Sequence, residues 1–156
     1  MPRRATSAAV AVALALAVAG CGGSSGPTRA SFAKAFSVQR AALAALGQDV
    51  GSAVSGARRQ NDATLAAEFQ QLAERATALA GALGGLSTPK QYRNDLSALQ
   101  SSVTQVAGTL HSIQAAALAH DATAARAGGE AIVTDAAQVK SYSSTLSKKL
   151  GLPDAQ

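Results

Sequence analysis

The chain has 156 residues, which suits one domain and leaves too little length for a second of ordinary size. Hydrophobic residues make up 47% of it but aromatic residues only 3%, and alanine dominates. Because alanine favours helices and is depleted in strands, this composition predicts an all-α protein. The net charge of +5 comes without basic residues interleaved with aromatic side chains, so we expect no nucleic-acid binding.

Residues 1–20 are predicted to be a signal peptide. Arg3 and Arg4 precede an apolar run from Ala8 to Ala19 that contains no charged residue. A run of about 12 residues is typical of a signal-peptide core and is too short to span a bilayer, which takes about 20. Without Arg3 and Arg4, 12 basic and 9 acidic side chains remain.

The apolar run ends in Val18-Ala19-Gly20-Cys21. These four residues resemble the lipobox of bacterial lipoproteins, although the first position of the motif is most often Leu. The resemblance implies diacylglycerol transfer to the Cys21 thiol, cleavage after Gly20 and, as an option, palmitate or a similar acyl group on the new amine. We therefore expect Cys21 to anchor the protein by lipid to the extracytoplasmic face of the cell membrane. An ordinary secretory signal that leaves Cys21 a free thiol, or an uncleaved membrane anchor, stays open.

Residues 21–30 form the expected lipidated cysteine and tether. The stretch is rich in Gly and Ser, and such stretches behave as flexible coil. The folded domain is then expected over residues 31–152.

Four segments of that domain carry apolar residues at alternating steps of three and four. This spacing places the apolar residues on one face of each helix, and short connections make neighbours antiparallel. The sequence therefore predicts an up-down-up-down four-helix bundle. The expected helices are Ser31–Arg58, Asp62–Leu83, Pro89–Ala119 and Ala122–Leu150, with the apolar faces Phe32, Phe36, Leu43, Leu46, Val50, Val54; Leu65, Phe69, Leu72, Ala76, Leu79, Leu83; Tyr92, Leu96, Leu99, Val103, Val106, Leu110, Ile113; and Ile132, Ala136, Val139, Ser143, Leu146, Leu150.

Helix starts are predicted from capping residues. Thr88 is the expected N-cap of the third helix, with Gln91 closing a capping box. Asn61 and Asp121 are the expected caps of the second and fourth helices. The similar openings of these two helices, Asn-Asp-Ala-Thr and His-Asp-Ala-Thr, could also reflect a duplicated hairpin.

Glycines indicate two helix ends, and one further glycine pair conflicts with a predicted helix. Gly84-Gly85 and Gly151 stand where left-handed C-terminal residues are expected. Gly128-Gly129 falls inside the fourth helix, where each glycine costs about 1 kcal/mol relative to alanine. Close packing against Phe69 or a mild kink explains the pair most simply, and approach of a ligand to the backbone is the alternative.

The residue types needed for metal, haem or nucleophilic chemistry are not arranged in any known pattern. No Glu precedes a His by three residues, the only Met is Met1, and Cys21 is the only cysteine. His111 and His120 are nine residues apart and do not share a helix face. We therefore expect no catalytic, metal or cofactor site and no enzyme activity.

Two pairs of cations end helices, Arg58-Arg59 and Lys148-Lys149. Cations at a helix C-terminus interact favourably with the helix dipole, which is the simplest role for both pairs. Contact with anionic lipid headgroups would require larger clusters.

Beyond the lipobox, the composition resembles that of Ala-rich helical lipoproteins of high-GC Gram-positive bacteria, a likeness that assigns no site. Two functions are considered. The first is a non-catalytic envelope interaction module that docks another envelope protein, or its own copy, at small residues such as Gly81, Ala82 and Gly84-Gly85. The alternative is a sensor-like bundle that binds a small molecule near Tyr92, Tyr142 and Gly128-Gly129. A cavity of about 300 Å³ or more between the helices would favour this alternative.

Overall fold

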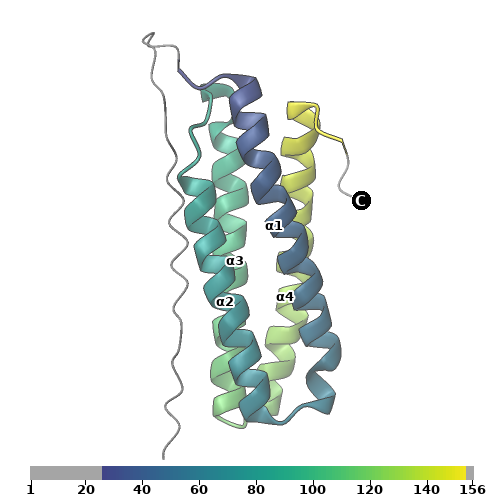
Figure 1. Ribbon diagram of the computed structural model, residues 1–156. Helices are drawn as coiled ribbons and strands as arrows, with labels where there is room; N and C mark the ends of the chain where they lie inside the picture. Colours follow the sequence, from purple (N-terminus) through teal and green to yellow (C-terminus); the bar gives the residue numbers. More distant parts are fainter. Residues whose placement is uncertain (1–25, 154–156) are drawn as a thin grey trace, which may run out of the picture.

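The computed structural model describes residues 26–153, and these form an up-down-up-down bundle of four helices (Figure 1). The long helices are α1 (Arg29–Gly56), α2 (Asp62–Gly84), α3 (Arg93–Leu118) and α4 (Ala122–Leu150). Short 3₁₀ turns, η1 (Ala57–Arg59) and η2 (Lys90–Tyr92), follow α1 and precede α3. The predicted fold class is therefore confirmed, with no strand among the described residues.

Helix α1 begins two residues earlier than Ser31 because Thr28 caps it. The Thr28 hydroxyl accepts a hydrogen bond from the Ser31 backbone N–H at 3.1 Å, and the Ser31 hydroxyl accepts one from the Thr28 N–H at 3.1 Å. This reciprocal pair is a capping box in which serine occupies the position usually held by Glu or Gln. The caps expected at Asn61 and Asp121 are confirmed.

The cap predicted at Thr88 is wrong. Its hydroxyl donates a hydrogen bond to the Leu86 carbonyl at 2.8 Å instead of accepting one from the helix. The first turn after Pro89 is the 3₁₀ turn η2, and regular α-helix starts only at Arg93. A 3₁₀ turn satisfies the early N–H groups with tighter backbone bonds, so it removes the need for a side-chain cap.

Helix ends agree with the prediction at one of the two glycine sites. Gly151 has a φ of 73° and ends α4 in the left-handed conformation, as expected. Gly85 instead ends α2 with a φ of −78°, so a left-handed residue there is a wrong prediction. The other left-handed residue in the described chain is His120, which has a φ of 54° after the end of α3.

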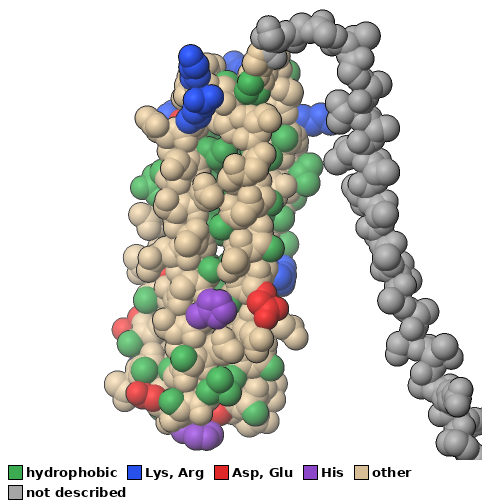
Figure 2. All heavy atoms as spheres, turned by 90° about the vertical axis from the view of Figure 1, so that its left-hand side faces the viewer, with side chains coloured by type: hydrophobic (Ala, Val, Ile, Leu, Met, Phe, Trp, Pro, Cys, Tyr) green, Lys and Arg blue, Asp and Glu red, His purple; other side chains and the backbone are tan. Residues whose placement is uncertain are grey.

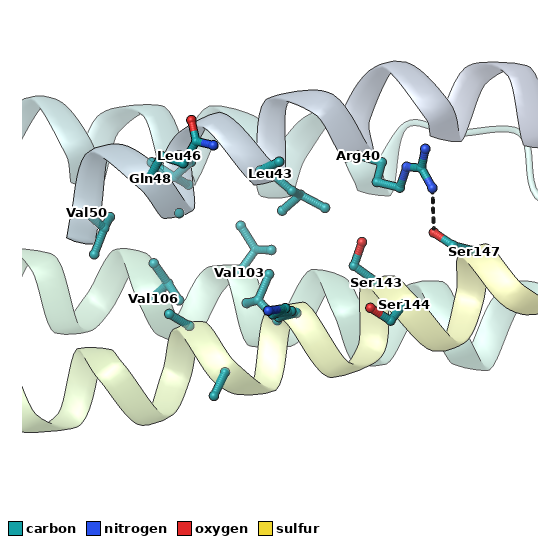
Figure 3. A pocket seen from close by; sticks show the side chains of 16 residues that line it. Arg40, Leu43, Leu46, Gln48, Val50, Val103, Val106, Ser143, Ser144 and Ser147 are labelled. Carbon is teal, nitrogen blue, oxygen red and sulfur yellow. Dashed lines mark hydrogen bonds between the residues drawn. The ribbon is translucent and has the colours of Figure 1, made fainter. Parts of the chain in front are cut away.

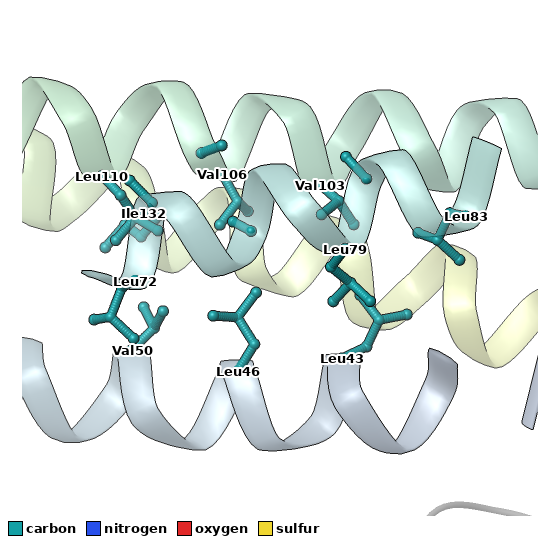
Figure 4. Packing of buried hydrophobic residues seen from close by; sticks show 14 of the residues in the cluster. Leu43, Leu46, Val50, Leu72, Leu79, Leu83, Val103, Val106, Leu110 and Ile132 are labelled. Carbon is teal, nitrogen blue, oxygen red and sulfur yellow. The ribbon is translucent and has the colours of Figure 1, made fainter. Parts of the chain in front are cut away.

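Almost all residues of the predicted apolar faces are buried in the core. Figure 4 shows leucine and valine side chains of α1 meeting those of α2 and α3. Three residues predicted to face the core are only half-buried: Val54 on α1, and Ala136 and Val139 on α4. The two α4 exceptions mark the place where the bundle is not closed.

Polar side chains link the helices at the surface. Asp49 on α1 pairs with Arg75 on α2 at 2.7 Å, and both side chains are half exposed. Such exposed pairs contribute little stability, typically 0 to ~1 kcal/mol. The Thr109 hydroxyl on α3 donates to the Asp135 carboxylate on α4 at 2.6 Å in a partly buried setting.

The glycine pair in α4 is explained by packing, against a different residue from the one expected. A Cβ atom placed on Gly128 would lie 2.5 Å from Cγ1 of Ile113, which is buried in α3. A Cβ on Gly129 would meet nothing within 4 Å. Gly128 therefore lets α4 approach α3 closely at Ile113, not at Phe69.

Candidate functional site

The predicted lipid-attachment residue, Cys21, lies outside the described residues. Its assignment therefore rests on the sequence motif alone. None of the helices in the described part of the chain is long and apolar enough to cross a membrane.

The residues expected to line a ligand pocket do not come together. Tyr92 is buried and stacks on Phe32, with ring centroids 5.7 Å apart. The Gly128 backbone is covered by Ile113. Neither tyrosine and neither glycine of that set lines the cleft described below, so this part of the prediction is wrong.

The small residues considered for partner docking are exposed. Gly81, Ala82, Gly84 and Gly85 all lie on the surface at the C-terminal end of α2. The Gln100 side chain lies against Gly84, where a Cβ would come within 2.6 Å of its amide nitrogen. Gln100 therefore crowds Gly84, whereas a Cβ placed on Gly81 would meet nothing within 4 Å.

The two histidines lie apart and have separate partners. His111 Nδ1 is 3.2 Å from the Gln114 side-chain oxygen, and His120 Nδ1 is 2.5 Å from the Asp62 carboxylate. Among the described residues, no group of three His, Cys, Asp or Glu side chains is placed to hold a metal ion. The His120–Asp62 pair sits at an exposed end of the bundle, where it links α2 to the start of α4.

A cleft of about 630 Å³ opens between α1, α3 and α4. It exists because α2 and α3 are closely packed against each other, whereas α1 makes few close contacts with α4. Small residues face the gap, so no side chain fills it: Ala44 and Gly47 on α1, and Ala136 and Ala137 on α4. The half-buried state of Ala136 and Val139 is the direct result.

The walls of the cleft are mainly apolar. Leu43, Leu46 and Val50 of α1 face Val103 and Val106 of α3 across it (Figure 3). A pocket of a few hundred Å³ with apolar walls and a few polar groups is typical of small-molecule sites.

One end of the cleft is polar. Arg40 of α1 donates a hydrogen bond to the Ser147 hydroxyl of α4 at 3.5 Å and another to the Pro153 carbonyl. Ser143 and Ser144 lie one turn along α4, and the Ser143 hydroxyl points into the cleft (Figure 3). Ser147 and Ser143 are only 3% and 9% exposed, so this end combines buried hydroxyls with a guanidinium.

The sequence contains a signal for this site that its apolar pattern concealed. Arg40 follows Phe36 by four residues and precedes Leu43 by three, so a charged residue occupies a core-facing step of α1. Ser143 occupies the corresponding kind of step on α4. A cation and a hydroxyl at core-facing positions of helices that become neighbours would have indicated a polar cavity between them.

The sequence matches no protein-family model, no curated protein and no solved structure.

Proposed function

We propose that this protein is a lipid-anchored binding protein of the extracytoplasmic membrane face, and that the cleft between α1, α3 and α4 takes a small, largely apolar molecule. The observation that carries the proposal is the cleft of about 630 Å³, roughly twice the volume of ~300 Å³ at which ligand pockets begin. Its apolar walls favour binding because they remove apolar ligand surface from water. The lipobox at Val18–Cys21 supports the location.

Two glycines of α1 provide a matched test of the cleft. Gly47 lines it, and a Cβ placed there meets nothing within 4 Å. Gly51 lies one turn further along the same helix, is equally free of neighbours and does not line the cleft. Gly47→Leu therefore fills the site, whereas Gly51→Leu makes the same chemical change outside it.

Both variants should be more stable than the parent, because leucine is a far better helix former than glycine, by about 0.5–1 kcal/mol. Only Gly47→Leu should lose binding of a neutral fluorescent probe such as N-phenyl-1-naphthylamine. The measurement is a fluorescence titration of the polypeptide 22–156, which retains every described residue. Equal binding by the two variants would show that the cleft is not the site.

That outcome would favour the other candidate, a non-catalytic module that binds a second envelope protein. The exposed surface around Gly81 and Ala82 supports this candidate, since small residues let a partner helix approach closely. We propose no catalytic role for either candidate.

A further inference from the structure

The cleft between α1, α3 and α4 has charge of one sign. Arg40 and Lys140 are the charged residues that line it, and no Asp or Glu does. The salt bridges within the described part of the chain do not involve Arg40 or Lys140. They pair Asp49, Asp62 and Asp95 with cations elsewhere on the bundle. Arg40 is therefore without a carboxylate partner among the described residues, and its bonds go to a hydroxyl and a backbone carbonyl.

Polarity also changes along the cleft. Arg40, Ser143 and Ser147 lie at one end, while Leu46, Val50 and Val106 lie toward the other (Figure 3). A guanidinium can bind a carboxylate through two parallel hydrogen bonds, and such charge-assisted bonds are about twice as strong as neutral ones. The Ser143 hydroxyl, which points into the cleft, can donate a further bond.

Volume limits the size of the ligand. At ~30 Å³ for a water-sized group, a space of about 630 Å³ holds on the order of 20 non-hydrogen atoms. That suits one long acyl chain with its head group.

We propose that the cleft binds a single-chain amphiphile with a carboxylate head, such as a long-chain fatty acid. The head lies at Arg40 and Ser143, and the chain runs along Leu46, Val50 and Val106. This inference rests on the proposed function and specifies its ligand. The Arg40 cation favours a negatively charged head group, and the apolar walls favour a hydrocarbon chain.

The test compares palmitate with its neutral methyl ester in displacement of N-phenyl-1-naphthylamine from the polypeptide 22–156. Palmitate should displace the probe at about tenfold lower concentration than the ester, the effect expected of a hydrogen bond to a charged group. Arg40→Gln should remove most of this preference, and probe affinity is measured for each variant so that palmitate and ester are compared at equal probe occupancy. Lys34→Gln is the matched control, since it removes one exposed cation from α1 outside the cleft.

The outcomes separate this inference from the proposed function. Probe binding with no preference for palmitate, or a preference that survives Arg40→Gln, would overturn the carboxylate assignment and leave the cleft as an apolar site. Failure of the probe to bind, or binding that Gly47→Leu does not affect, would overturn the proposed function as well.

A second inference rests on charge at one end of the bundle. Arg29 at the start of α1, Lys90 and Arg93 at the start of α3, and Lys148 and Lys149 at the end of α4 lie together there. Of these, Lys149 pairs with Asp95 at 2.8 Å. Figure 2 shows Lys and Arg side chains gathered at this end and the histidines lying away from it. The fold thus places Lys148 and Lys149 beside three further cations, and the resulting cluster of five has a size typical of segments that bind anionic lipid.

Helix α1 begins at this end of the bundle, so the chain that leads back to Cys21 leaves the bundle here. Thr28 follows Cys21 by seven positions in the chain, a reach of at most about 25 Å. We infer that the cationic end docks on an anionic bilayer surface and orients the bundle there. We choose lipid as the occupant because the proposed lipid anchor at Cys21, on which this inference also rests, would hold this end of the bundle within that reach of the bilayer surface.

The test is co-sedimentation of the polypeptide 22–156, which lacks the lipid, with phosphatidylglycerol/phosphatidylcholine vesicles at low salt. Lys90→Gln with Lys148→Gln should weaken binding roughly 30-fold, from ~1 kcal/mol for each cation near the surface. Arg58→Gln with Arg59→Gln removes the same charge from the opposite end and should leave binding unchanged. Equal effects of the two pairs, or equal binding to pure phosphatidylcholine, would overturn the inference.

Discussion

Alanine should stabilise the protein at one of the two neighbouring glycines of α4 and should fail to do so at the other. Alanine in place of glycine inside a helix gains about 1 kcal/mol of stability through backbone entropy. At Gly129 nothing opposes this gain, because a Cβ there meets no atom within 4 Å. Gly129→Ala should therefore stabilise the protein by up to ~1 kcal/mol.

At Gly128 the gain is opposed by a clash. The new Cβ would lie 2.5 Å from Cγ1 of Ile113, a branched and buried side chain that cannot simply swing away. Overpacking of this kind costs about 1–3 kcal/mol. Subtracting the helix gain of ~1 kcal/mol leaves Gly128→Ala between neutral and about 2 kcal/mol destabilising.

Thermal unfolding followed by circular dichroism measures both variants. One kcal/mol corresponds to a shift of roughly 4 °C in Tm for a domain of this size, so the two variants should differ by several degrees. In an Ile113→Ala background the clash is gone, and Gly128→Ala should then stabilise. If Gly128→Ala raises Tm as much as Gly129→Ala in the parent protein, the close approach of α4 to α3 at Ile113 is refuted.

Three further outcomes are expected. Thr28→Ala should destabilise the polypeptide 22–156 by ~1 kcal/mol through loss of its capping box, while Thr88→Ala should cost less; the reverse order in thermal melts would contradict the assigned caps. Cys21→Ser in the full chain should abolish incorporation of labelled fatty acid and change membrane retention, and undiminished labelling would rule out the lipobox. The purified protein should be colourless, and chelator should leave its helicity and Tm unchanged, because its described residues hold no group of three His, Cys, Asp or Glu side chains placed for a metal ion; a fall of several degrees would direct attention to His111 and His120.

Local features of the chain were sufficient to predict where most helices lie. The second and fourth helices were expected at Asp62–Leu83 and Ala122–Leu150, and α2 and α4 differ from these by at most one residue. Asn61 and Asp121 determine both starts because a side-chain oxygen beside the first turn satisfies helix N–H groups locally. Thr88 misled the prediction because a 3₁₀ turn after Pro89 satisfied the same groups by backbone bonds.

Spacing along the sequence also determined which face of each helix enters the core, since apolar residues three and four apart lie on one side. It did not determine how closely two such faces approach. Ala136 and Val139 have the same spacing as buried Ile132 and Leu146, yet they border an open cleft. The distance between α1 and α4 depends on how well side chains from several helices fill the space between them, and small residues on both helices leave it unfilled.

The candidate site therefore belongs to the tertiary structure. Arg40 and Ser143 are separated by about a hundred residues, and only the antiparallel arrangement of α1 and α4 brings them to one end of one cleft. The cationic cluster arises in the same way, from the ends of three helices. Hydrogen bonds within a turn act over a few residues and can be read from sequence, whereas cavities and charge clusters depend on which distant segments the fold places together.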